Sequence, residues 1–74
     1  MTSAEIQFCK RTCDTASALG IGARRYEAAN GLAFGYEWQL PSGEIVQGQA
    51  YLGMNEKRAL HAACKTLSEK LLEL

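Results

Sequence analysis

From Leu32 to Leu40, large apolar residues alternate without a break with residues that are small or polar. The even-numbered positions are large and apolar, and the odd-numbered ones include Glu37 and Gln39. A period of two that is rich in aromatic residues is typical of a β-strand buried on one face. The pattern therefore predicts a strand whose even-numbered side chains form core, with Glu37 and Gln39 facing solvent.

Turn-forming residues flank this strand on both sides. Asn30-Gly31 precedes it and is a strong hairpin signal, so a first strand is expected from Arg24 to Ala29. Pro41-Ser42-Gly43 follows it and favours a second turn, after which Glu44 to Leu52 reads as a third strand. Short turns at both junctions predict an antiparallel meander.

A helix is expected before the strands, from Ser3 to Leu19. Thr2 and Glu5 have the spacing of a capping box, and Gly20 is a typical residue after a helix end. Three- and four-residue spacing places four small or apolar side chains on one stripe, which we expect to be buried: Ile6, Cys9, Cys13 and Ala16.

A second helix is expected from an N-cap at Asn55 to the end of the chain. Its apolar face would contain Leu60, Ala63, Cys64, Leu67, Leu71 and Leu74. The whole chain is then one α+β domain, residues 1–74, with αβββα order: a three-stranded antiparallel sheet and two helices packed on one face. At 74 residues its core must be thin.

Composition narrows the class of protein. Eight basic and eight acidic residues give a net charge of zero, which argues against strong non-specific polyanion binding but leaves room for a local patch. Three cysteines and an N-terminus without a signal-peptide pattern favour a cytoplasmic protein. No apolar run is long enough to predict a membrane span.

The second half of the chain resembles the double-stranded RNA-binding domain. The resemblance covers Leu32 to Leu74 and rests on Phe34-Gly35-Tyr36-Glu37-Trp38, Gly48-Gln49-Ala50, Lys57-Arg58-Ala59, Ala62-Ala63 and Leu67. It implies duplex RNA binding through the first helix, the first hairpin loop and the start of the second helix. Glu56 stands where that family usually has a lysine, and the Asn30-Gly31 turn lacks the family's loop histidine.

Basic side chains on the polar face of the second helix are the candidate phosphate contacts. The resemblance and the helix dipole favour this role, and a solvated charged face is the alternative. The candidate nucleic-acid-binding residues are Lys10, Arg11, Asn30, Lys57, Arg58, His61 and Lys65, with Arg24 and Arg25 as additional cations.

A protein partner is the alternative to RNA. The odd-numbered residues of the third strand are expected to form part of an open sheet face of mixed apolar and uncharged polar character: Ile45, Gln47, Gln49 and Tyr51. This face, or an exposed strand edge, could form a homodimer. A small adaptor or a phage-type inhibitor, such as an anti-CRISPR protein, also fits the size and charge.

Catalysis and bound metal are not expected. The chain has one histidine and none of the common nucleophile or phosphate-loop motifs. Cys9, Cys13, His61 and Cys64 have a spacing that two helices could use for zinc, but the cysteines lie on apolar stripes, where cysteine acts as a small hydrophobic residue. We therefore predict a binding protein without a cofactor.

Overall fold

A computed structural model describes residues 1–53 and 55–73, and it has the predicted α+β class and element order. Met54 and Leu74 lie outside the described residues, so the expected place of Leu74 on the apolar face of the last helix is not addressed. The elements are α1 (Ser3–Ala18), β1 (Gly22–Ala28), the 3₁₀ turn η1 (Ala29–Gly31), β2 (Ala33–Gln39), β3 (Ile45–Gln47), β4 (Tyr51–Leu52) and α2 (Glu56–Glu73).

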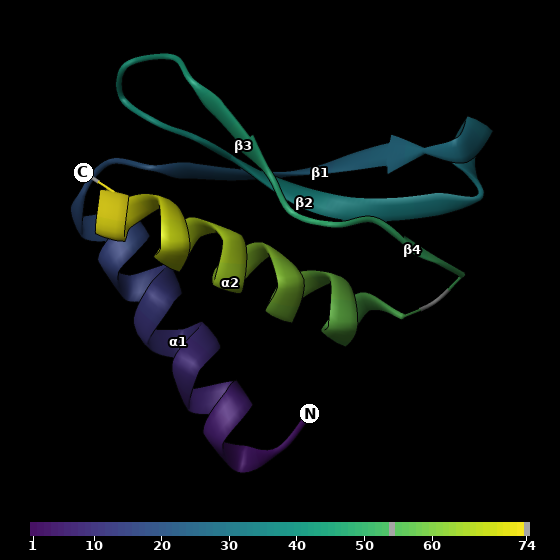
Figure 1. Cartoon of the computed structure of the whole chain (residues 1–74), viewed down its shortest axis with the longest axis horizontal. Helices are drawn as coiled ribbons and strands as arrows, with labels where there is room; N and C mark the ends of the chain where they lie inside the picture. The colour runs from purple at the N-terminus through teal and green to yellow at the C-terminus, as the bar shows by residue number, and fades with distance from the viewer. Residues whose placement is uncertain (54, 74) are drawn as a thin grey trace.

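The sheet is antiparallel and is built around β2 (Figure 1). On one side, β1 pairs with the whole of β2, from Gly22 opposite Gln39 to Ala28 opposite Ala33. On the other side, β3 and β4 pair with successive parts of the same strand. The predicted third strand is thus two short strands.

The break between β3 and β4 changes which face the later residues occupy. Trp38 lies opposite Val46, so an unbroken register would place Ala50 opposite Phe34, whereas Tyr51 occupies that position. One extra residue is therefore accommodated between the two short strands, as in a β-bulge. Directly opposite residues point to the same face of a sheet, so Tyr51 lies on the face of Phe34.

This shift corrects the predicted open face. Ile45 and Gln47 keep the expected parity, but Tyr51 lies on the helix side, and Gln49 lines a hollow against α2. The strand comes close to α2 just before the extra residue, because a Cβ atom at Gly48 would lie 2.6 Å from the Cα atom of Ala63.

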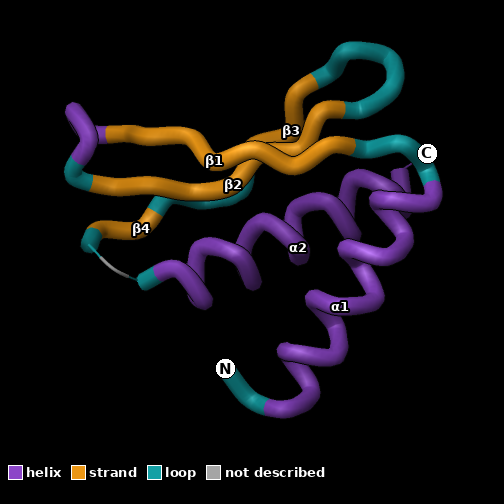
Figure 2. Tube along the Cα trace, turned by 180° about the vertical axis from the view of Figure 1, so that it is seen from behind, coloured by secondary structure: helices purple, strands orange, loops and turns teal. Residues whose placement is uncertain are grey.

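Both helices lie on one side of the sheet (Figure 2), α2 directly against it and α1 mainly against α2. Ala59, Ala63 and Leu67 of α2 are fully buried. The indole N–H of Trp38 donates to the carbonyl oxygen of Ala63 at 2.9 Å, which ties the central strand to this helix. Among the described residues, neither helix is long and apolar enough to cross a membrane.

The buried face of α1 differs from the predicted stripe. Cys9, Thr12 and Ala16 are buried, whereas Ile6 and Cys13 are exposed. The stripe is rotated because α1 packs on α2 rather than flat on the sheet. Thr12 tolerates burial because its hydroxyl donates to the carbonyl oxygen of Phe8 at 2.9 Å.

The predicted start of α1 is confirmed, and its end at Ala18 lies one residue before the predicted Leu19. The Thr2 side chain accepts a hydrogen bond from the backbone N–H of Glu5, and the Glu5 side chain accepts one from the Thr2 backbone, which completes the capping box. Gly20 has a φ of +74°, the left-handed conformation that favours glycine after a helix end.

Two residues of β2 and its flank differ in exposure from what the alternation predicted. Leu32 is 71% exposed, because it precedes β2 and lies in the turn that follows η1. Glu37 points to the open face but is only 5% exposed. It accepts hydrogen bonds from Arg24 at 2.7 Å and from Gln47 at 3.1 Å, one neighbour on each side of the central strand.

Candidate functional site

Two of the elements that the resemblance implicates adjoin each other, the start of α2 and the first residues of the chain, and η1 lies apart from them at the tip of the β1–β2 hairpin. In Figure 1, η1 and the start of α2 are at the same end of the molecule. The first residues of the chain also reach this end, where a hollow is lined by Met1, Glu5, Asn55, Lys57, Arg58 and His61. The element order and the antiparallel sheet are consistent with the shape of the double-stranded RNA-binding domain.

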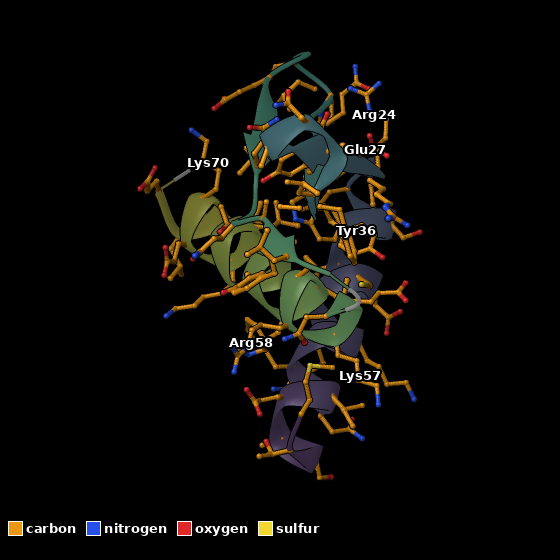
Figure 3. The ribbon with its side chains drawn as sticks, turned by 90° about the vertical axis from the view of Figure 1, so that its right-hand side faces the viewer. Arg24, Glu27, Tyr36, Lys57, Arg58 and Lys70 are labelled. Atoms are coloured by element: carbon orange, nitrogen blue, oxygen red, sulfur yellow. The ribbon has the colours of Figure 1, made fainter. Side chains whose placement is uncertain are left out.

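Lys57 and Arg58 both extend from the first turn of α2 but point in different directions (Figure 3). Consecutive residues on a helix are about 100° apart, so two neighbours cannot contact the same point. The Arg58 guanidinium lies 5.8 Å from the centre of the Tyr51 ring, within the range of a cation–π contact. Both side chains are exposed and can reach a partner.

A hollow of about 420 Å³ runs beside α2, between this helix and the segment that leads into β4. We call it the α2 groove. It contains three of the predicted nucleic-acid residues and two of the predicted interface residues, which the bulge has brought to the helix side. Its lining residues are Gln49, Tyr51, Arg58, His61, Ala62, Lys65, Thr66 and Glu69.

The α2 groove offers cations beside one aromatic ring. His61 is held in place by an edge contact with Phe8, with ring centres 5.9 Å apart, and by Glu5, whose carboxylate oxygen is 3.5 Å from its Nε2. The Thr66 hydroxyl donates to the carbonyl oxygen of Ala62 at 3.0 Å. The arrangement suits recognition of an anion that carries a flat or apolar group.

Carboxylates are interspersed with these cations. The pKa of Glu5 is lowered mainly by a hydrogen bond from the Thr2 backbone and next by one from the Thr2 side chain. The Glu5 side chain therefore stays charged near His61. Glu56 accepts a hydrogen bond from the Tyr36 hydroxyl at 2.9 Å. The pKa of Tyr36 is raised mainly by burial and next by this hydrogen bond, so its hydroxyl remains a neutral donor. The end of the molecule where α2 begins therefore carries both signs of charge.

The remaining predicted nucleic-acid residues do not join the α2 groove. Asn30 is in η1, with a left-handed φ of +56°. Lys10 and Arg11 lie in the middle of α1 on separate sides of that helix. Lys10 lines a mainly apolar hollow with Ile6, Cys13 and Leu60, and Arg11 lines another with Phe8, Thr15, Ser68 and Leu72.

The open face of the sheet is a hydrogen-bonded surface that sequence reasoning missed. The Tyr26 ring crosses Gly35, where a Cβ atom would lie 2.9 Å from the ring, and its hydroxyl donates to the Gly48 carbonyl oxygen. Gln47 donates to Glu37 in the same layer. Glycine between large residues on the central strand is the sequence signal that could have indicated a covering aromatic ring.

The four residues considered as zinc ligands are not assembled into a site. Within the described ranges 1–53 and 55–73, no three or more side chains of the metal-binding types converge on one point. His61 faces Glu5 and Phe8 instead. Cys9 and Cys64 are buried in the core and Cys13 is exposed, and burial is the main cause of a raised pKa for the Cys64 thiol.

Comparison of the chain with family models, with curated proteins and with solved structures gave no match in any of the three searches.

Proposed function

We propose that this chain is a non-enzymatic binding module of the double-stranded RNA-binding shape, and that duplex RNA is its ligand. The observation that carries the proposal is that the α2 start adjoins the first residues of the chain, on the side of the molecule toward which the η1 hairpin tip also extends. These are the three elements through which the resembled family contacts RNA. Lys57, Arg58 and Lys65 would supply the charge, and His61 would add a hydrogen-bonding side chain.

The charge pattern indicates how strong such binding would be. A-form RNA is recognised through its phosphates and 2′-hydroxyls across a groove, so affinity grows with the number of cations that reach it. Here Lys57 and Arg58 are exposed, but Glu5 and Glu56 lie beside the same helix start. We therefore expect moderate affinity that falls steeply as salt rises.

The test is a titration of a duplex RNA of about 16 base pairs, the span that such domains cover, at several salt concentrations. Replacing both Lys57 and Arg58 with alanine should weaken binding at least tenfold at low salt. The slope of log affinity against log salt should also fall by about one for each phosphate-binding cation that is removed.

Lys70→Ala is the matched control, because Lys70 is a cation of the same helix but pairs with Glu44 at 2.9 Å, away from the α2 start. This control should leave RNA affinity unchanged. Absence of duplex binding by the unaltered protein at low salt would refute the proposal, as would equal losses of affinity in the two variants.

A protein partner is the second candidate, and exposed leucines favour it. Leu32 and Leu52 are each 71% exposed and lie at the same end of the sheet, since the Gly53 N–H donates to the Leu32 carbonyl oxygen. Capture from lysate before and after nuclease treatment separates the two candidates. Partners that survive the nuclease favour this second function, and partners that disappear favour RNA.

A further inference from the structure

β1 forms an open edge of the sheet. It is the last strand on its side, and it is the longest strand together with β2. All seven of its residues pair with β2, so its other edge is free of strand partners within the described part of the chain. In Figure 2, α1 lies below the sheet layer rather than along this edge. Such an edge is a template for another strand.

Two opposite charges lie on the helix-side face of this edge strand. Arg25 is opposite Tyr36 and Glu27 is opposite Phe34, so both point to the same side. Arg25 rests over the Phe34 ring at 4.1 Å, which holds its guanidinium along the sheet. Neither residue takes part in an ion pair among the residues that the structure describes.

Symmetry limits how two copies of β1 can pair. A two-fold axis perpendicular to the sheet makes the strands antiparallel and keeps like faces together. Centring the axis on Arg25 would pair all seven residues but would place this arginine opposite itself. Centring the axis on Arg24 would likewise place Arg24 opposite its own copy. Centring it on Tyr26 instead places Arg25 of each copy opposite Glu27 of the other.

The Tyr26-centred register contains five residue pairs and two identical Arg25–Glu27 pairs. Arg24 then lies opposite Ala28, so no like charges meet. Opposite charges directly across an antiparallel pair are stabilising, whereas like charges are destabilising. Charged side chains on an edge strand usually discourage pairing with another chain, but the two charges of β1 are complementary to a second copy of the same strand.

We propose that two copies of this chain associate through their β1 edges, antiparallel and centred on Tyr26, with Arg25 of each copy paired to Glu27 of the other. The proposal does not depend on RNA binding. A contact of one strand per copy is small, so the dimer forms only at high protein concentration.

The experiment uses complementary charge reversals followed by sedimentation equilibrium. The unaltered protein should show a concentration-dependent dimer. Arg25→Glu and Glu27→Lys should each be monomeric, because each places like charges across the interface. An equimolar mixture of the two variants should recover the dimer, since the introduced glutamate then faces the introduced lysine and the unaltered Glu27 faces the unaltered Arg25.

Two further measurements keep the test decisive. Lys10→Glu and Glu69→Lys make the same changes in net charge on exposed helix positions and should leave the dimer intact. The double variant Arg25→Glu/Glu27→Lys should dimerise again if both single variants fold. A monomer at every concentration of the unaltered protein, or no recovery on mixing, would overturn the proposal.

Discussion

Glu37 shows how one carboxylate can be buried on the solvent side of a sheet. Its position in the central strand gives it a neighbour on each side, Arg24 from β1 and Gln47 from β3. Together they donate to both carboxylate oxygens, so the side chain leaves water without losing its hydrogen bonds. Alternation along β2 predicted its face correctly, but the pattern of one strand contains no information about the neighbours that cover it.

The Glu37 network predicts that stability depends on pH. The pKa of Glu37 lies below its ordinary value of 4.5, mainly because of the hydrogen bond from Arg24 and next because of the one from Gln47. A depressed folded-state pKa contributes stability that is present above the unfolded value and is lost as pH falls through the folded value. Urea midpoints should therefore drop below about pH 4.5 in the unaltered protein.

Glu37→Gln removes this ionisation and provides the comparison. The variant should be less stable than the unaltered protein at pH 7, and the gap should narrow as the pH falls toward 3. Glu69→Gln, at an exposed position of α2, serves as the control and should keep the full acid dependence. A constant gap between Glu37→Gln and the unaltered protein at all pH values would contradict the assignment.

At the scale of elements, local signals predicted more than long-range ones. The capping box of Thr2 and Glu5 and the turn at Gly20 depend on residues a few positions apart, and both are confirmed. The prediction of one continuous third strand was wrong. The strand breaks where it lies close to α2, a segment distant in the sequence. Gly48 was visible in the sequence, but its contact with Ala63 was not.

The same limit applies to the candidate site. The α2 stripe of Arg58, His61 and Lys65 follows from helical periodicity alone, and the three line one groove. Tyr51 joins them only because a bulge reverses its face, which strand alternation cannot predict. Charge and the resemblance placed Lys10 and Arg11 with the stripe, but their positions on α1 keep them apart from the α2 groove.

Substitution at Gly48 tests the bulge. Gly48→Ala places a Cβ atom 2.6 Å from the backbone of Ala63, so the segment or the helix must move. Overpacking of this kind costs about 1–3 kcal/mol. Chemical denaturation should report a destabilisation of that size, with weaker packing of Tyr51 on α2.

Gly22→Ala is the control, because a Cβ atom there meets nothing within 4 Å and its φ lies outside the left-handed region. Its unfolding free energy should stay within about 0.5 kcal/mol of the unaltered protein. Equal effects of the two substitutions would contradict the close packing of Gly48 on α2.

For the whole molecule, the two layers are held together along one helix. α2 contacts the sheet on one side and α1 on another, so the core cluster converges on its buried residues. The sequence predicted the two-layer α+β class because amphipathic helices and a one-sided sheet have few ways to bury their apolar faces. The tilt of α1 depends on side-chain packing between helices, so the predicted stripe was misplaced.

This architecture makes Leu67 a sensitive position in the core. It is one of the largest fully buried side chains, whereas Leu72, five residues along the same helix, is 86% exposed. A domain of 74 residues has a total stability of roughly 4–11 kcal/mol. Truncating a buried leucine to alanine costs about 2–5 kcal/mol, which is a large part of that total.

Leu67→Ala should therefore lower the free energy of unfolding by about 2–5 kcal/mol and lower the thermal midpoint sharply in circular dichroism. Leu72→Ala should change the free energy of unfolding by no more than about 0.5 kcal/mol, because its side chain is already in water. If Leu67→Ala were equally mild, the two layers would have to be joined by contacts other than this helix. The sheet with its Tyr26 and Glu37 networks would then carry most of the stability.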